Sequence, residues 1–259
     1  MHHAYIDRFA QGDTPVHRLD ARAKLAVVAV YTALAVSVPK YSLAALFPYA
    51  ILPFAMLAFG QIPLGFVAKH LLLVSPFVVF VAVFNPLYDS TPVLVRVGRE
   101  AFWVRGGVLS CLNICGKFVL TVSALVALVS TTRFSDLLKA MAWFRLPKLF
   151  IVELSFLYRY LFLLVEQVQR MKRARDCRAV GPTPFGRRLK AAGGIVGNLF
   201  LRTLERGERV YACMQARGFD GTVRTLSHFR MRAGDYAFLV GSVVFVVALR
   251  FGGALIAGH

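Results

Sequence analysis

The sequence predicts an all-α integral membrane protein with about five transmembrane helices and a set of amphipathic helices on the cytoplasmic side. Three observations lead to this fold class. The chain of 259 residues is 58% hydrophobic and only 17% charged, which is little charge for a soluble domain of this length. It contains long stretches without Asp, Glu, Lys or Arg, and a helix needs about 20 apolar residues to cross hydrocarbon. The net charge of +18 is concentrated in one part of the chain.

The expected spans follow from these uncharged stretches, which cover 25–39, 41–68, 71–88 and 118–132. We place transmembrane helices at about 25–40, 43–60, 70–88, 107–131 and 233–251, with a longer loop at 89–106. The first 24 residues are polar and show no cleavable signal pattern. The chain therefore divides into a cytoplasmic N-terminal segment (1–24), a four-helix transmembrane region (25–132), a basic region (133–232) and a C-terminal transmembrane helix (233–259).

The basic residues predict the orientation in the membrane. With the N-terminus inside, the short flanking segments hold 13 basic residues inside and 5 outside, as the positive-inside rule expects. The region 133–232 alone has 20 basic and 7 acidic residues, a net of +13. We expect a multi-pass protein of the cell (inner) membrane whose N-terminus and basic region are cytoplasmic.

The segment LFIVELSFLYRYLFLLV (149–165) is ambiguous because it is apolar but carries Glu153 and Arg159. A single crossing there would put the basic residues of 170–232 outside. A second crossing at about 191–201 would restore the orientation, but that stretch is short and rich in glycine. We favour helices that lie along or just beneath the membrane, because FSDLLKAMAWF (134–144) has apolar residues at helical spacing beside charged ones.

The basic region contains a weak internal repeat with an offset of 39 residues. It matches Glu166, Arg170, Met171 and Arg178 to Glu205, Arg209, Val210 and Arg217. In both copies a glutamate precedes an arginine by four residues, the favourable order on a helix. The last arginine lies between two small residues, and a glycine follows closely, where helices often end. The pattern fits two helices that each present one arginine to a partner, and it also fits ordinary solvated charge.

These two tripeptides resemble the signature of the transmembrane coupling (T) component of energy-coupling factor (ECF) transporters. Ala216-Arg217-Gly218 matches the family's Ala-Arg-Gly pattern fully, and Cys177-Arg178-Ala179 keeps the arginine between other small residues, with Arg175 as a rival. HRLDARAKL (17–25) is similar to the family's Leu-Asp-Pro-Arg-x-Lys-Leu entry to the first span, with Ala21 in place of proline. DRFA (7–10), 130–141 and 146–171 resemble the cobalt-type (CbiQ) branch.

The resemblance implies a non-catalytic subunit of an ATP-driven importer, for cobalt or alternatively for nickel or a vitamin. Its partners would be two ATP-binding cassette subunits, a substrate-binding (S, CbiM-like) membrane subunit, a small accessory membrane subunit in some assemblies, and the lipid bilayer. ATP and Mg²⁺ would be held by the ATP-binding subunits. The ATPase-coupling residues implied for this chain are Cys177, Arg178, Ala179, Ala216, Arg217 and Gly218.

Other candidate sites are weaker. GVLSCLNICGKF (107–118) ends in Gly116-Lys117 and a phenylalanine. A phosphate-binding loop needs glycine at 111 and Ser or Thr at 118, where this chain has Cys111 and Phe118. Lys117 could serve subunit packing, snorkel to the interface, or take part in transport. We interpret Cys111 and Cys115 as core residues and Met1-His2-His3 as an ordinary chain start, and expect no catalytic, cofactor, metal or nucleic-acid site. The rival class is a self-sufficient membrane carrier or channel, which would need polar groups facing a pathway inside the spans.

Overall fold

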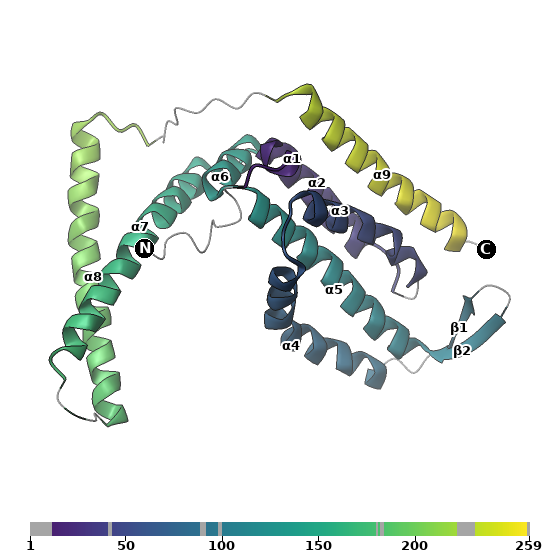
Figure 1. Ribbon diagram of the computed structural model, residues 1–259, viewed down its shortest axis with the longest axis horizontal. Coiled ribbons are helices and arrows are strands. Elements are labelled where there is room, and N and C mark those ends of the chain that lie inside the picture. Colours follow the sequence, from purple (N-terminus) through teal and green to yellow (C-terminus); the bar gives the residue numbers. More distant parts are fainter. Residues whose placement is uncertain are drawn as a thin grey trace. The chain divides into compact units, whose positions relative to one another are not determined.

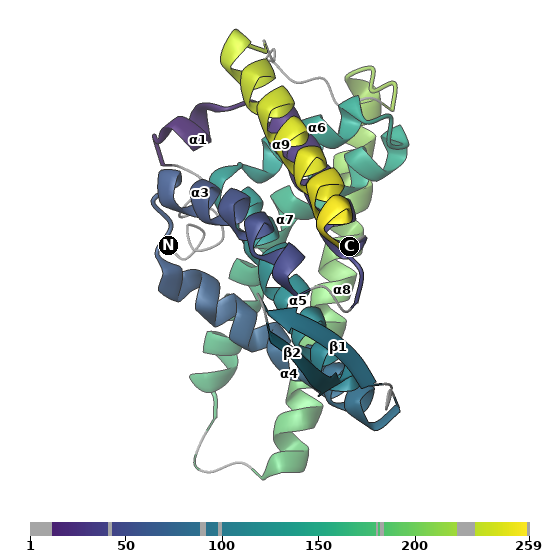
Figure 2. The same ribbon diagram turned by 90° about the vertical axis from the view of Figure 1, so that its right-hand side faces the viewer.

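The computed structural model describes residues 12–40, 43–88, 92–97, 100–179, 181, 184–221 and 231–257. The described chain is helical apart from one two-stranded hairpin (Figure 1; Figure 2). It divides into two compact units, residues 1–140 with 229–259 and residues 141–228. We call the first the membrane unit and the second the α7–α8 unit, and each is described by itself.

The membrane unit is a bundle built around α5. α9 lies along α2, α4 packs on α5, and α5 also contacts α2 and α3 (Figure 1). The helices are α1 (Pro15–Arg18), α2 (Ala21–Val36), the 3-10 turns η1 (Ala44–Leu46) and η2 (Pro48–Ala50), α3 (Ile51–Phe59), α4 (Leu64–Tyr88), α5 (Gly106–Thr131) and α9 (Ala233–Ala257). The helix α6 (Phe134–Trp143) begins in this unit, whose boundary falls after residue 140.

Three described helices are long and apolar enough to cross a membrane: Leu64–Pro86, Gly106–Thr131 and Ala233–Phe251. They correspond to the predicted spans 70–88, 107–131 and 233–251. The predicted span 25–40 is the 16-residue α2, which begins and ends four residues earlier. The predicted span 43–60 is interrupted, because two 3-10 turns precede the nine-residue α3. Pro48 opens the second of these turns, and a proline has no N–H to continue a helix.

The core of this unit combines small residues with two buried tyrosines. Ala35, Ala124 and Ala127 are fully buried, so the backbones of α2 and α5 can approach closely. The Tyr31 hydroxyl donates a 3.0 Å hydrogen bond to the Tyr49 carbonyl, which satisfies a polar group that burial would otherwise penalise.

On α4, by contrast, large apolar side chains face outward. Leu72, Leu73 and Phe77 are each more than 70% exposed. An apolar surface of this kind suits hydrocarbon rather than water. Together with the three helices that are long and apolar enough to cross a membrane, it identifies the chain as a multi-pass membrane protein.

The predicted loop 89–106 contains a β-hairpin that we did not expect. β1 (Pro92–Val97) pairs antiparallel with β2 (Glu100–Arg105), in a register from Pro92 opposite Arg105 to Val97 opposite Glu100 (Figure 2). The run PVLVRV is rich in β-branched residues, and this was the available signal.

The α7–α8 unit consists of two long helices joined by a short connection, α7 (Lys148–Asp176) and α8 (Phe185–Ala216). The ambiguous segment 149–165 lies within α7, and 191–201 lies within α8. Neither helix is among the described helices that are long and apolar enough to cross a membrane. Neither helix has a fully buried residue, so this unit consists mostly of accessible surface.

Candidate functional site

The second arginine tripeptide lies at the C-terminal end of α8. Arg217 is the C-cap residue, and Gly218 has a φ of +76°, which L side chains rarely adopt. The Gly218 N–H bonds to the Gln215 carbonyl and the Phe219 N–H to the Met214 carbonyl, the hydrogen-bond pair of a Schellman motif. The glycine of Ala216-Arg217-Gly218 is therefore required by the backbone that ends the helix.

The first tripeptide ends α7 by a different backbone route. Cys177 is the C-cap, and its N–H bonds to the carbonyl of Arg173. The N–H groups of Arg178 and Ala179 then bond to the carbonyls three residues earlier. Ala179 is not among the described residues with positive φ, and Gly181 is the left-handed one among the described residues of this connection. An alanine can therefore stand here where the other copy needs a glycine.

Both arginines lie at helix ends, as predicted, and both side chains are exposed. Among the described residues, neither side chain has a hydrogen-bond or ion-pair partner. The rival Arg175 is engaged, because its guanidinium holds the Asp176 carboxylate at 2.7 Å. Geometry therefore favours Arg178 over Arg175 as the group available to a partner. The docking role of the six tripeptide residues stays a prediction.

The two copies of the 39-residue repeat form different side-chain contacts. Arg170 pairs with the Glu166 carboxylate, as the i, i+4 spacing predicts. In the second copy, Arg209 donates to the main-chain carbonyl of Glu205 at 3.3 Å instead. The expected second ion pair is therefore wrong for this structure.

Arg170, Met171, Ala174 and Arg178, at the C-terminal end of α7 and just after it, form one wall of a groove. This groove of about 1110 Å³ lies between the C-terminal part of α7 and the N-terminal part of α8. We call it the basic groove. Its charged lining residues are Arg170, Arg175, Asp176, Arg178, Arg187, Arg188, Lys190 and Arg202. The contribution from α8 was not predicted, although the run FGRRLK (185–190) was a visible signal.

The other parts of the same two helices enclose an apolar cleft of about 410 Å³. It lies between the N-terminal part of α7 and the C-terminal part of α8, and Phe219 from the Schellman motif lines it together with Met214. Its walls include Val152, Phe156, Tyr160, Leu163, Leu164, Val210 and Tyr211. The α7–α8 unit therefore offers a basic surface at one end of the pair and an apolar one at the other.

The LDARAK motif (19–24) joins α2 to α9, a structural role that its sequence did not suggest. Asp20 caps α2 by accepting from the Arg22 N–H at 2.9 Å, and its own N–H donates to Asp235 on α9 at 2.9 Å. The second carboxylate oxygen of Asp235 accepts from the Arg232 N–H at 2.8 Å. Ala21 is the first residue of the helix, where proline is well suited and alanine is also tolerated.

Lys24 joins the same cluster to the end of α5. Its ammonium donates to the Thr131 carbonyl at 2.9 Å. Lys24 is buried, and the carboxylates of Asp136, Asp20 and Asp235 lie close enough to act on its charge. Its ammonium compensates these carboxylates. We call Asp20, Lys24 and Asp235 the polar clasp.

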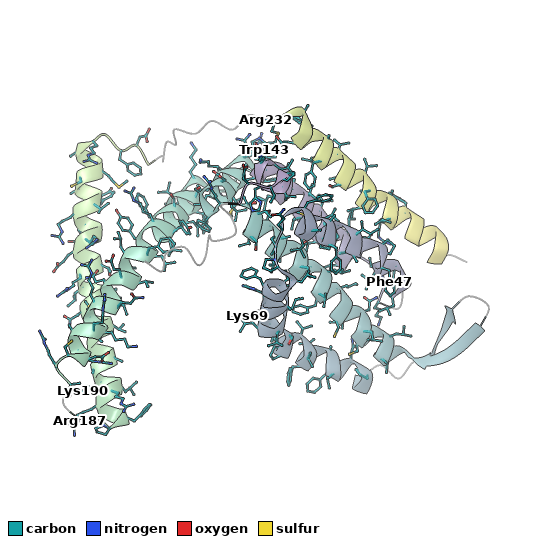
Figure 3. The ribbon with its side chains drawn as sticks, in the orientation of Figure 1. Phe47, Lys69, Trp143, Arg187, Lys190 and Arg232 are labelled. Atoms are coloured by element: carbon teal, nitrogen blue, oxygen red, sulfur yellow. The ribbon has the colours of Figure 1, made fainter. Side chains whose placement is uncertain are left out.

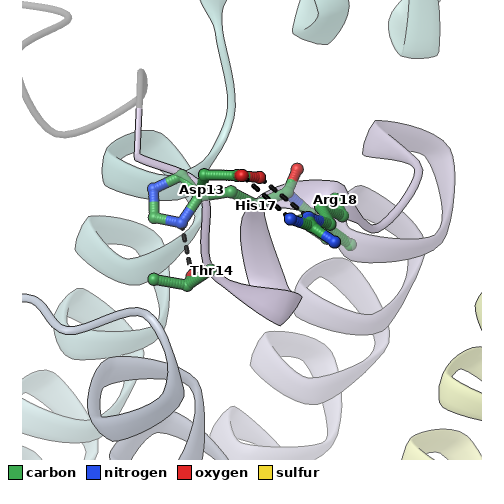
Figure 4. Close-up of polar contacts among 5 residues, drawn as sticks. Asp13, Thr14, His17 and Arg18 are labelled. Carbon is green, nitrogen blue, oxygen red and sulfur yellow. Dashed lines mark hydrogen bonds and ion pairs between the residues drawn. The ribbon is translucent and has the colours of Figure 1, made fainter.

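The short helix α1 beside the clasp is held by local contacts (Figure 4). The Arg18 guanidinium donates to both carboxylate oxygens of Asp13 at 2.8 Å, and it holds the pKa of that exposed carboxyl below its usual value. The Thr14 hydroxyl and the Nδ1 atom of the His17 ring lie within hydrogen-bond distance, 2.6 Å apart. These contacts fix the chain just before α2 and suggest no chemistry.

Lys117 contacts the C-terminal end of α2. Its ammonium donates to the carbonyls of Val36 and Val38, and Asn113 donates to the Pro39 carbonyl at 3.3 Å. Of the three readings of Lys117, these contacts support packing, because a helix end carries carbonyls without intrahelical partners.

The described residues contain no group of three or more His, Cys, Asp or Glu placed to hold a metal ion. Cys111 and Cys115 are half-buried free thiols on α5. His2, His3 and the DRFA segment lie outside the described residues.

Comparison with known proteins connects this geometry to a family. The model of the CbiQ family, described as cobalt transport protein, matches residues 12–228. The chain belongs to the CbiQ family. The match covers α1 through α8, and so includes the polar clasp residues of α2, both tripeptides, the basic groove and the apolar cleft.

Three individual relatives share between 26% and 32% of the aligned residues with this chain. The energy-coupling factor transporter transmembrane protein EcfT of Bacillus subtilis is 26% identical over 261 residues, covering 95% of this chain and 96% of the relative. The nickel permease LarQ of Lactiplantibacillus plantarum is 32% identical over 114 residues, covering 44% of this chain and 41% of the relative. An uncharacterised protein of Methanocaldococcus jannaschii is 28% identical over 143 residues, covering 55% of this chain. The chain spans about half the length of that relative, 49%.

Proposed function

We propose that this chain is the transmembrane coupling component of an ATP-driven energy-coupling factor importer for cobalt ions. The observation that carries the proposal is the pair of long helices, α7 and α8, that each end in an exposed arginine without a partner among the described residues. The family match and the end-to-end likeness to a protein named EcfT support it.

The proposed mechanism is mechanical. Arg178 and Arg217 each enter a groove of one ATP-binding cassette subunit, where a guanidinium can bind carboxylate or carbonyl oxygens with several hydrogen bonds at once. ATP and Mg²⁺ are bound and ATP is hydrolysed in those subunits, and this chain is not an enzyme. Their closure moves the helix ends, and the exposed apolar faces of α7 and α8 transmit the movement to a separate substrate-binding membrane subunit.

The contacts inside the membrane unit argue for a scaffold rather than a self-sufficient carrier. Lys117 and Asn113 are bound to the carbonyls that end α2, and Asn85 of α4 donates to Ser110 of α5 at 2.9 Å. These polar groups satisfy one another or the backbone instead of facing a pathway.

The deciding experiment is a pull-down from detergent-solubilised membranes of the native host. Wild type, Arg178→Glu, Arg217→Glu and the double variant are compared for bound ATP-binding subunits. Lys172→Glu, an exposed charge reversal on α7 outside the grooves, is the matched control. Truncating a docked arginine typically costs about 2–5 kcal/mol, so the single variants should lose most of the bound subunit while the control keeps it.

The membrane partner should stay attached in all variants. If the double variant retained the ATP-binding subunits and still supported ATP-driven metal uptake, the coupling role would be wrong.

Nickel is the second candidate substrate, because a relative with 32% identity carries the name nickel permease. Ion uptake by cells that express the whole assembly, measured with cobalt and nickel in competition, separates the two ions. Uptake of cobalt that excess nickel does not reduce supports the cobalt assignment, and the reverse result supports nickel.

A further inference from the structure

The ends of α7 and α8 present chemically different surroundings to a partner. Building on the proposed function, we infer that the Arg178 end docks on a carboxylate-rich surface of a cytoplasmic subunit, and that Arg187, Lys190 and Arg202 of α8 bind that surface together with Arg178. The Arg217 end docks without such a set of charges.

The basic groove has a large uncompensated positive charge. Its lining contains seven basic residues and one acidic residue, Asp176. The charge of Arg175 is paired with Asp176, and that of Arg170 with Glu166. Among the described residues, four lining side chains have no hydrogen-bond or ion-pair partner: Arg178, Arg187, Lys190 and Arg202. Like charges held together in one groove repel each other, so a bound anion lowers the free energy of this arrangement.

These charges approach the groove from two walls. Arg178 comes from the end of α7, whereas Arg187, Lys190 and Arg202 come from α8, spaced so that they share one helix face (Figure 3 labels Arg187 and Lys190). Apolar side chains also line the groove, including Met171 and Ile195. A carboxylate that enters between the helices is therefore within reach of guanidinium groups from both walls, which favours an extended acidic segment over a single small ion.

The apolar residues of α8 indicate that the groove faces a protein rather than the lipid surface. Phe185, Leu189, Val196 and Phe200 are each more than 60% exposed, and none lines the groove. At about 100° per residue they lie on the side of α8 opposite Arg187. The face of α8 suited to hydrocarbon or to an apolar membrane subunit thus points away from the groove, and an acidic water-soluble surface remains as the complementary partner.

In the part of the chain that the structure describes, the Arg217 end carries no such set of charges. From residue 205 to residue 220 the chain has three basic residues and three acidic ones: Arg206, Arg209 and Arg217 against Glu205, Glu208 and Asp220. The neighbouring cavity is the apolar cleft, to which the Schellman motif contributes Phe219. Docking at the Arg178 end is therefore strongly electrostatic, whereas docking at the Arg217 end combines a single arginine with apolar contact.

The test compares two triple variants of the full chain in the copurified complex. Arg187→Gln/Lys190→Gln/Arg202→Gln removes three charges from the groove, and Lys172→Gln/Arg173→Gln/Arg209→Gln removes three from exposed positions outside it. The affinity for the ATP-binding subunits is measured as NaCl is raised. We expect the groove variant to lose about tenfold in affinity and much of its salt dependence, whereas the control changes little.

Combining the groove variant with a substitution of Arg178 or Arg217 shows at which helix end the lost charges act. The groove variant should add little to the loss caused by Arg178→Ala, because both disturb one contact, and should add fully to the loss caused by Arg217→Ala. An equal loss in both triple variants would show a general charge effect and overturn the inference. A groove variant that keeps its affinity but binds less phosphatidylglycerol would assign the groove to lipid and overturn it as well.

The inference and the proposed function fail separately. If the groove variant behaves like wild type while Arg178→Glu/Arg217→Glu releases the ATP-binding subunits, the inference is wrong and the function stands. If the double charge reversal also retains the subunits, the proposed function is wrong.

Discussion

In the membrane unit the key charged side chains are bound to other parts of the chain, whereas in the α7–α8 unit several are left exposed. Lys24 and Lys117 donate to main-chain carbonyls, and Asp235 accepts from two N–H groups. Arg178 and Arg217 have no such partner among the described residues. Charge in the first unit therefore holds helices together, while charge in the second is exposed to the surroundings of the protein.

Disruption of the polar clasp should destabilise the protein most. Asp235→Ala leaves the buried N–H of Asp20 and the part-buried N–H of Arg232 without their acceptor, and an unsatisfied buried group costs about 1–3 kcal/mol. We expect the free energy of unfolding in detergent to fall by about 2–4 kcal/mol. Asp235→Asn keeps one acceptor oxygen and should lose less. Equal stability of wild type and Asp235→Ala would show that the clasp is not a structural element.

Lys117 tests whether a charge inside a membrane helix is structural. Lys117→Met removes the donor from the Val36 and Val38 carbonyls and should lower the free energy of unfolding by about 1.5–3 kcal/mol, the range for charge-assisted hydrogen bonds. ATP-driven uptake should persist in proportion to the amount of folded protein. Loss of uptake at unchanged stability would instead assign Lys117 to transport.

The two tripeptides can be compared directly through their last residues. Gly218→Ala places a side chain on a residue with φ +76° but meets no neighbouring atom, so its cost is the backbone strain of about 1–2 kcal/mol. Ala179→Gly, at a residue without positive φ, should change stability by less than about 1 kcal/mol. Thermal unfolding and helix content measure both. Similar losses in the two variants would contradict the difference between the two helix ends.

The smallest effect is expected at the exposed ion pair of the first repeat. Glu166→Gln removes the partner of Arg170 and should cost only about 0.2–0.5 kcal/mol of helix stability. It also frees a guanidinium that lines the basic groove, so binding of an acidic partner should be unchanged or stronger. Weaker binding would mean that the carboxylate itself contacts the partner.

Much of the fold was predictable because long apolar stretches and capping residues act locally. The spans at 107–131 and 233–251 began within one residue of the observed helices, and Gly218 marked the end of α8. The interrupted second span and the hairpin at 92–105 were missed. Pro48 and the run PVLVRV carried the signals there, but hydropathy outweighed them.

Composition and short-range spacing were enough to predict the class of protein, the concentration of positive charge and the two tripeptides. Which charges are satisfied depends on the tertiary structure. It joined Asp20 to Asp235 across 215 positions of sequence and Lys24 to Thr131 across 107. It also placed Arg187 and Arg202 in the same groove as Arg178. Contacts between distant residues depend on how helices pack in three dimensions, and no local pattern in the chain specifies them.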